Sequence, residues 1–150
     1  MRIIGGTFRG LKLAEVGAGD AAAHLRPTTD RVRESIFNLL VNGRIAQTGD
    51  PVTGARVLDL FAGTGALGLE ALSRGAARVA FVDDGSAARA LLRRNIELMR
   101  AMGQTDVWRR DATRMGPNRG AGYTLVFLDP PYGKGLGEQA LASCVASRSA

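Results

Sequence analysis

The sequence of 150 residues has a hydrophobic fraction of 45% and a charged fraction of 23%, ordinary values for one globular domain with one core. Its single cysteine, Cys144, and single histidine, His24, exclude an internal disulfide and a metal centre built from cysteines or histidines. The net charge of +6, carried mostly by arginine, favours a nucleic-acid partner, although a genome that prefers arginine codons would give the same composition.

The first 45 residues are predicted to form a small hairpin followed by a helix. Short apolar stretches flank Gly5-Gly6 within residues 2–13, a pattern typical of a hairpin around a glycine turn. Thr29 or Asp30 can then cap a helix that ends at Asn42-Gly43. Its predicted apolar stripe is Val32, Ile36, Leu39 and Leu40.

From Arg56 onward the pattern alternates strands and helices. Strands are predicted over residues 57–60, 78–82, 105–108 and 125–128. Helices are predicted over residues 66–74, 86–102 and 136–146. This alternation indicates an α/β fold in which helices cover both faces of a parallel sheet.

The first of these strands leads into a glycine-rich turn. Gly63 and Gly65 let the main chain turn sharply and approach a ligand, and ligands of doubly wound sheets bind at the carboxyl ends of the strands. Asp83 ends the second strand, where a carboxylate can accept hydrogen bonds from both ribose hydroxyls, or can cap the next helix. Asp111 follows the third strand, within reach of an adenine edge. The candidate cofactor residues are Asp59, Phe61, Ala62, Gly63, Thr64, Gly65, Asp83, Asp111 and Ala112.

Two other interpretations of this turn stay open. Gly63, Gly65 and Gly68 also fit the G-x-G-x-x-G pattern of a nicotinamide-dependent oxidoreductase. Asp59 could cap the turn and have no role toward a ligand.

The tetrapeptide Asp129-Pro130-Pro131-Tyr132 closes the fourth strand with a carboxylate, two stiff prolines and an aromatic ring. Such an edge can hold a planar amino group, because the Asp129 carboxylate and the Pro130 carbonyl each accept one amino proton. Tyr132 would stack on a base that has left its helix or loop. The tetrapeptide resembles the catalytic motif of S-adenosylmethionine-dependent amino-methyltransferases. The alternative is a cis-proline turn with a packing tyrosine.

The N-terminal block makes the resemblance more specific. Residues 2–6, Arg9-Gly10, Leu13 and residues 26–40, together with residues 57–65 and the tetrapeptide, resemble the RsmD family. That family methylates the exocyclic N2 of a guanine in small-subunit (16S) ribosomal RNA. The resemblance implies a Rossmann-like class I methyltransferase fold, S-adenosyl-L-methionine as cofactor, and a catalytic core at residues 46–150 behind an RNA-contacting extension at residues 1–45. It also implies that the RNA contacts are Arg2, Arg9, Lys12, Arg26, Arg31, Arg33 and Lys134.

The chain departs from the family pattern at two points. The family usually carries glutamate where this chain has Asp83, and it continues through three further strands after the tetrapeptide. We therefore expect a C-terminally truncated sheet in the spatial order three-two-one-four, with the fourth strand at an exposed edge.

The expected partner is small-subunit ribosomal RNA in an assembled or assembling particle. We expect a monomeric, cytoplasmic protein with no membrane or metal partner, because no apolar run approaches the ~18 residues of a membrane span and no secretory signal is present. The alternatives are an adenine-N6 methyltransferase acting on DNA or RNA, an inactive truncated remnant, and an NAD-dependent oxidoreductase.

Overall fold

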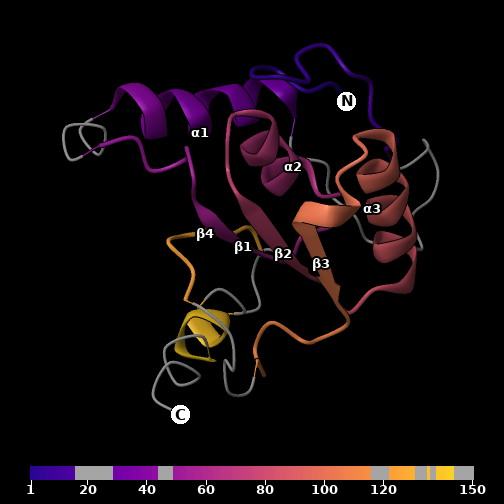
Figure 1. Ribbon diagram of the computed structural model, residues 1–150. Coiled ribbons are helices and arrows are strands. Elements are labelled where there is room, and N and C mark those ends of the chain that lie inside the picture. Colours follow the sequence, from indigo (N-terminus) through magenta and orange to yellow (C-terminus); the bar gives the residue numbers. More distant parts are fainter. Residues whose placement is uncertain (16–28, 44–48, 116–121, 131–134, 136–137, 144–150) are drawn as a thin grey trace.

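The computed structural model describes residues 1–15, 29–43, 49–115, 122–130, 135 and 138–143 (Figure 1). The elements alternate as the sequence predicts. In chain order they are α1 (Asp30–Asn42), β1 (Arg56–Leu60), α2 (Ala66–Ser73), β2 (Arg78–Val82), α3 (Ser86–Leu98), the 3-10 helix η3 (Met102–Gln104), β3 (Thr105–Trp108) and β4 (Leu125–Leu128). Residues 138–143 are also helical. None of the helices in these ranges is both long and apolar enough to span a bilayer.

The four strands form one parallel sheet in the order β3-β2-β1-β4, which confirms the predicted order. Strand β1 lies in the centre and pairs with β2 from Arg56 to Leu60 and with β4 from Val57 to Leu60. Within the described part of the chain β4 pairs with β1 alone, so its other side is a sheet edge. In this register Leu60 of β1 is level with Leu128 of β4, and both strands therefore end at the same edge of the sheet.

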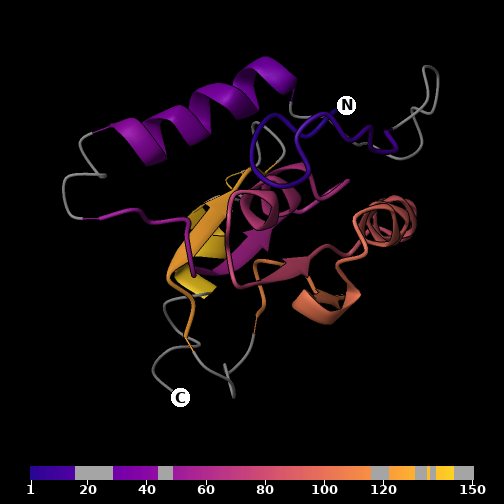
Figure 2. The same ribbon diagram turned by 45° about the horizontal axis from the view of Figure 1, so that its top comes forward.

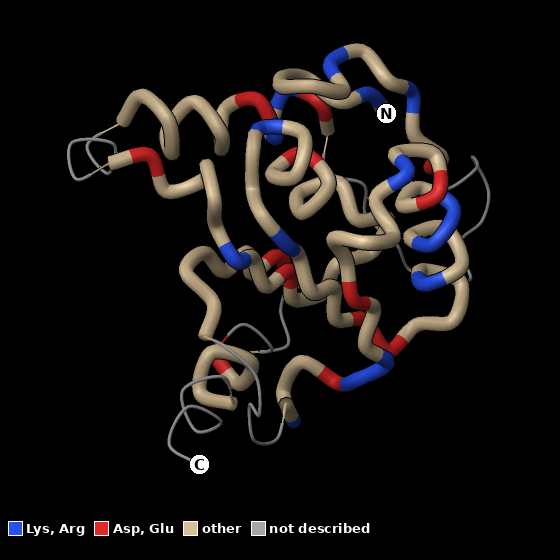
Figure 3. The backbone as a smooth tube through the Cα atoms, viewed as in Figure 1, with Lys and Arg blue, Asp and Glu red and all other residues tan. Residues whose placement is uncertain are grey.

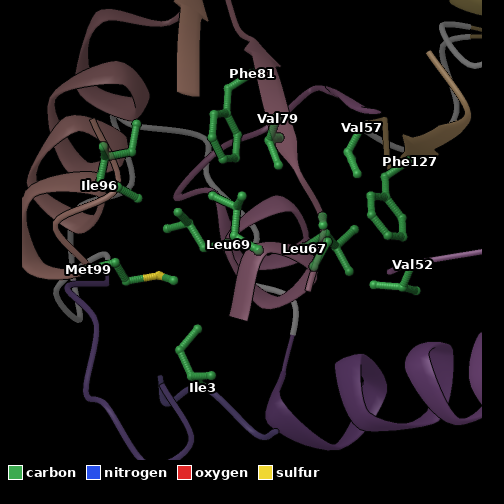
Figure 4. Packing of buried hydrophobic residues seen from close by; sticks show 14 of the residues in the cluster. Ile3, Val52, Val57, Leu67, Leu69, Val79, Phe81, Ile96, Met99 and Phe127 are labelled. Atoms are coloured by element: carbon green, nitrogen blue, oxygen red, sulfur yellow. The ribbon is translucent and has the colours of Figure 1, made fainter. Parts of the chain in front are cut away.

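The two faces of the sheet carry separate hydrophobic clusters. Alternate residues of β1 and β2 point to opposite faces, as a pleated strand requires. On one face Leu69 of α2 lies beneath Phe81 and Val79, and Ile3 and Met99 close the cluster on the side away from the sheet (Figure 4). On this side α2 lies between α1 and α3 in both views (Figures 1 and 2). The second cluster joins the opposite face to Ala112, Met115 and Ala140.

The N-terminal residues form a compact loop on the first face. The predicted hairpin is reduced to one antiparallel bridge, between Arg2 and Lys12. Ile3 and Leu13 are buried in the same cluster as Val57 of the central strand, so the extension and the sheet share one core.

Helix α1 has the predicted ends but presents a different face to the core. Its buried residues are Arg33 and Phe37, and the Phe37 ring packs against Phe127 of β4 with centroids 5.6 Å apart. The predicted apolar stripe is wrong for Val32 and Leu39, which are 50% and 67% exposed. The reason is that the helix turns Arg33 inward.

Helix α3 ends four residues earlier than predicted. Its last residue is Leu98, and Arg100 then adopts a left-handed conformation with φ of 53° before the chain enters η3. Leu98, expected on the apolar side, is exposed, whereas Asn95 is fully buried.

The buried carboxylate of Glu70 on α2 joins three parts of this face. One oxygen accepts hydrogen bonds from the Ile4 main-chain nitrogen (2.9 Å) and from Nε of Arg33 (3.1 Å). The other accepts from the Gly5 nitrogen (3.0 Å) and from Nε of Arg74 (2.8 Å). Since a buried charge is tolerated only when it is paired and hydrogen-bonded, these donors explain why Glu70 can lie in the core.

We expect Glu70→Gln to lower the free energy of unfolding by about 3 kcal/mol, because a glutamine amide turns one acceptor into a donor that faces other donors. The matched control is Glu34→Gln on the exposed side of α1, which should change it by less than about 0.5 kcal/mol. Urea unfolding measures both. Equal midpoints for the two variants would show that Glu70 does not hold this face together.

Candidate active site

The turn between β1 and α2 has an unusual main-chain conformation at the carboxyl end of the sheet. The φ angles of Phe61, Gly63 and Gly65 are 55°, 58° and 84°, in the left-handed region that residues other than glycine rarely adopt. Gly65 is the N-cap of α2, and a Cβ atom there would lie 2.4 Å from Cδ1 of Leu92. The sequence therefore needs glycine at this position both for the turn and for the close approach of α3. A strained phenylalanine beside it is typical of a ligand-binding turn.

Two carboxylates hold this turn in place. Oδ2 of Asp59, on β1, accepts a hydrogen bond from the Gly68 nitrogen (3.1 Å). Oδ2 of Asp83, at the end of β2, accepts from the Gly63 nitrogen (2.9 Å), and its Oδ1 accepts from the Gly85 nitrogen (2.8 Å). Asp59 thus supports the glycine turn through this contact, as one of the two interpretations of its role predicted. Asp83 is not the cap of α3, because Gly85 is in that position and has no side-chain cap.

The side chains at the ends of β1, β2 and β4 form an acidic group. Asp59 is 2% exposed, and burial raises its pKa well above the ordinary value of 3.8. The charges of Asp129 and Asp83 raise the pKa of Asp59 further. Asp129 and the glycine turn directly follow β4 and β1, two neighbouring strands that end level with each other at one edge of the sheet.

The predicted cofactor residues after β3 have contacts of their own, separate from those of the acidic group. Oδ1 of Asp111 accepts hydrogen bonds from the Thr113 nitrogen (2.8 Å) and hydroxyl (2.6 Å), which lower the pKa of Asp111. Ala112 is buried in the second hydrophobic cluster. Their roles toward an adenine ring stay predictions.

Part of the predicted catalytic motif is outside the described residues. Asp129 and Pro130 are described, whereas Pro131 and Tyr132 are not, and the same holds for Arg26 and Lys134. All described peptide bonds are trans, including the one between Asp129 and Pro130.

The predicted RNA contacts divide into exposed residues and one buried residue. Arg2, Arg9, Lys12 and Arg31 are exposed and remain available to a polyanion. The prediction is wrong for Arg33, which is fully buried. Its guanidinium donates to the carboxylates of Glu70 (3.1 Å) and Asp30 (2.7 Å) and to the Arg2 carbonyl, so it supports the N-terminal loop from inside.

Asn95 on α3 is a site residue that the sequence did not indicate. It is fully buried, and its Nδ2 donates hydrogen bonds to the carbonyls of Thr64 (3.0 Å) and Ala14 (2.9 Å). The signal that could have found it is helical spacing, because Asn95 lies three residues after Leu92 and four before Met99, on the buried side of the helix. Figure 3 shows several basic positions along this helix.

We expect Asp59→Asn to stabilise the protein at neutral pH. In the folded protein Asp59 keeps its proton to a higher pH than in the unfolded chain, so stability is lost as the pH rises from 3.8 through the raised folded pKa. Asparagine keeps the acceptor for Gly68 and avoids this loss, which should raise the free energy of unfolding at about pH 7 by on the order of 1–2 kcal/mol.

Urea unfolding across the pH range checks this expectation. The gain should vanish near about pH 3, where wild type is also protonated at this position. The exposed Glu97→Gln is the control and should show no gain. A variant that is equally stabilised at both pH values would contradict the assignment of the effect to ionisation.

The whole chain, residues 1–150, matches the sequence model of the family described as "Conserved hypothetical protein 95". It is 40% identical over 141 residues to "Ribosomal RNA small subunit methyltransferase D" of Escherichia coli, covering 94% of this chain and 65% of that protein. It is 41% identical over 135 residues to "Putative rRNA methyltransferase YlbH" of Bacillus subtilis, covering 88% of this chain and 67% of that one. The chain thus spans about two thirds of the length of these relatives.

Solved structures agree with the fold. The E. coli protein named "Putative methyltransferase yhhF" superposes with a TM-score of 0.71 at 36% identity, covering 95% of this chain and 70% of that one. The predicted Rossmann-like methyltransferase fold and the resemblance stated above are therefore confirmed. On its sequence match and its architecture, this chain belongs to the RsmD family, whose sequence model is described as "Conserved hypothetical protein 95".

Proposed function

We propose that this protein transfers a methyl group from S-adenosyl-L-methionine to the exocyclic N2 of a guanine in small-subunit ribosomal RNA. The names of its relatives support ribosomal RNA as the substrate class. The observation that carries the proposal is that Asp129 and the glycine turn lie together. Asp129 follows β4, the glycine turn follows the neighbouring β1 at the same level, and Asp129 acts electrostatically on Asp59 beneath that turn.

The residues at this edge fit the proposed cofactor in charge and in hydrogen-bonding capacity. S-adenosylmethionine would supply an electrophilic methyl group on a cationic sulfur. Asp59, Asp83 and Asp129 are three acids in a protein whose net charge is +6, and the charges of Asp129 and Asp83 both raise the pKa of Asp59. Each Asp83 oxygen accepts one main-chain hydrogen bond and has a further lone pair for a ribose hydroxyl.

Asp129 and Pro130 supply the acceptors for the amino group. The lone pair of an aromatic amine is delocalised into the ring, so the amine is a weak nucleophile. Two acceptors on a stiff main chain fix the direction of the nitrogen, and such alignment contributes to the rate. The Asp129 carboxylate also stabilises positive charge that develops on nitrogen as its bond to carbon forms.

Transfer of a labelled methyl group to unmethylated small ribosomal subunits tests this function. We expect Asp129→Ala to reduce transfer by at least about 100-fold, the usual scale for removing one electrostatic stabiliser, with cofactor binding retained. The matched control, Asp84→Ala, removes an exposed carboxylate after β2 and should keep near-normal turnover. Near-normal turnover of Asp129→Ala would overturn the proposed role.

The same assay separates the other candidate functions. Transfer to DNA in place of ribosomal subunits would favour an adenine-N6 methyltransferase. Binding of NAD, but not of S-adenosylmethionine, in a calorimetric titration would favour an oxidoreductase. Cofactor and RNA binding without transfer would favour an inactive remnant.

The exposed basic residues of the N-terminal loop are the proposed RNA contacts, and their effect should depend on salt. We expect Arg9→Ala to weaken RNA binding uniformly across sequences and to reduce the slope of log affinity against log salt by about one, as loss of one phosphate contact does. Filter binding at several salt concentrations measures this. Leu39→Ala, on the exposed side of α1, is the control. An unchanged slope would remove Arg9 from the contact surface.

A further inference from the structure

The carbonyl of Thr64 lies inside the glycine turn, and a side chain from α3 fixes it. Nδ2 of Asn95 donates to this carbonyl at 3.0 Å, and the Asn95 side chain is fully buried. The turn is therefore braced from β1 by Asp59, from β2 by Asp83 and from α3 by Asn95.

The same amide also binds the end of the N-terminal loop. Oδ1 of Asn95 accepts from the Ala14 nitrogen at 2.6 Å, and Nδ2 donates to the Ala14 carbonyl at 2.9 Å. The hydroxyl of Thr64 donates to the sulfur of Met1 at 3.7 Å, and the Met1 ammonium pairs with Glu15 at 3.3 Å. Both ends of the N-terminal loop thus meet at the glycine turn.

The middle of the loop is fixed to α2, the helix that the turn begins. The Ser73 side chain accepts from the Phe8 nitrogen (2.9 Å) and donates to the Gly5 carbonyl (2.6 Å). Gly6 has φ of 79°, and a Cβ atom there would lie 1.9 Å from the Ser73 carbonyl oxygen. The loop can therefore dock only with glycine at this position, and it contacts both helices that frame the turn.

We propose that docking of the N-terminal loop sets the affinity of the cofactor site, with Asn95 as the positioning residue that links the two. This inference rests on the proposed function, because it takes the glycine turn as the S-adenosylmethionine site. The two states are the loop docked on α2 and α3 and the loop released. In the docked state Ala14 orients the Asn95 amide, and the amide holds the Thr64 carbonyl in the conformation that the turn requires.

The first test changes Asn95, the residue that connects the N-terminal loop with the glycine turn. Asn95→Asp keeps the acceptor for the Ala14 nitrogen but places an oxygen against the carbonyls of Ala14 and Thr64. We expect its dissociation constant for S-adenosylmethionine to rise by about tenfold, the factor for loss of a buried hydrogen bond. Ile96→Val, at the next buried residue of α3, is a core-destabilising control that removes no hydrogen bond to the turn, and it should bind like wild type.

These titrations use the full chain at a temperature at which thermal unfolding shows every variant to be folded. In methyl transfer, Asn95→Asp should raise KM for the cofactor more than it lowers kcat, a split that a general loss of stability would not give.

The second test releases the loop from a distance. Gly6→Ala creates the clash with the Ser73 carbonyl and should weaken cofactor binding by about as much as Asn95→Asp, on the same tenfold scale. Gly10→Ala is the matched control: its φ of 86° imposes the same kind of strain, but a Cβ atom there has no neighbour within 4 Å. We expect Gly10→Ala to bind like wild type.

Coupling between the two sites must be reciprocal. Addition of S-adenosylmethionine to wild type should slow hydrogen exchange of the main-chain amides of Ala14, Ile4 and Gly5, and this effect should be lost in Asn95→Asp. If wild type binds the cofactor but Asn95→Asp and Gly6→Ala bind it equally well, only the present inference is overturned. If wild type binds no S-adenosylmethionine, the proposed function fails together with it.

Discussion

The hydrogen bonds to the Glu70 carboxylate are the interaction on which the packing of the N-terminal loop and the first two helices depends. It lies on α2, the helix that leaves the glycine turn, and takes hydrogen bonds from the N-terminal loop, from α1 through Arg33 and from its own helix through Arg74. A buried carboxylate without such donors would be strongly unfavourable, so each of these parts must be present for the others to pack. The interaction therefore fixes the N-terminal loop and α1 relative to the helix that positions the turn.

The strands were predictable because their signal is local. Continuous apolar runs bounded by glycine and polar residues define β2, β3 and β4 at the observed bounds, and parallel strands joined by helices restrict the order of the sheet. The end of α3 was not predictable in the same way. Gly103 is a usual stop signal, but the chain closes the helix earlier, with Arg100 in a left-handed conformation that glycine would adopt more easily.

The polar residues inside the fold were not predictable, because their partners are remote in the sequence. An arginine on a helix is expected at the surface. The burial of Arg33 becomes favourable through Glu70, 37 positions away, together with Asp30 and the Arg2 carbonyl. Asn95 lies on the buried stripe of α3 with Leu92 and Ile96, but its role depends on contacts with Ala14 and Thr64. The candidate site was predictable as a set of acids and glycines after strands. The hydrogen bonds that hold the turn come from different strands and helices, and a sequence motif does not predict such contacts.

Two features of the candidate site lower the stability of the folded chain, and both lie where we expect a ligand to bind. Asp59 is an acid in a buried position, repelled by Asp83 and Asp129, and Phe61 has a main-chain conformation that its side chain disfavours. Both features lie at the carboxyl edge of the sheet, where ligands of such sheets bind. A cationic ligand would remove part of the repulsion, so the same charges that weaken the folded chain would strengthen binding. The repulsion among these acids therefore favours a sulfonium ligand, which the glycine pattern alone does not. A nicotinamide dinucleotide would instead bring the negative charge of its pyrophosphate close to three carboxylates.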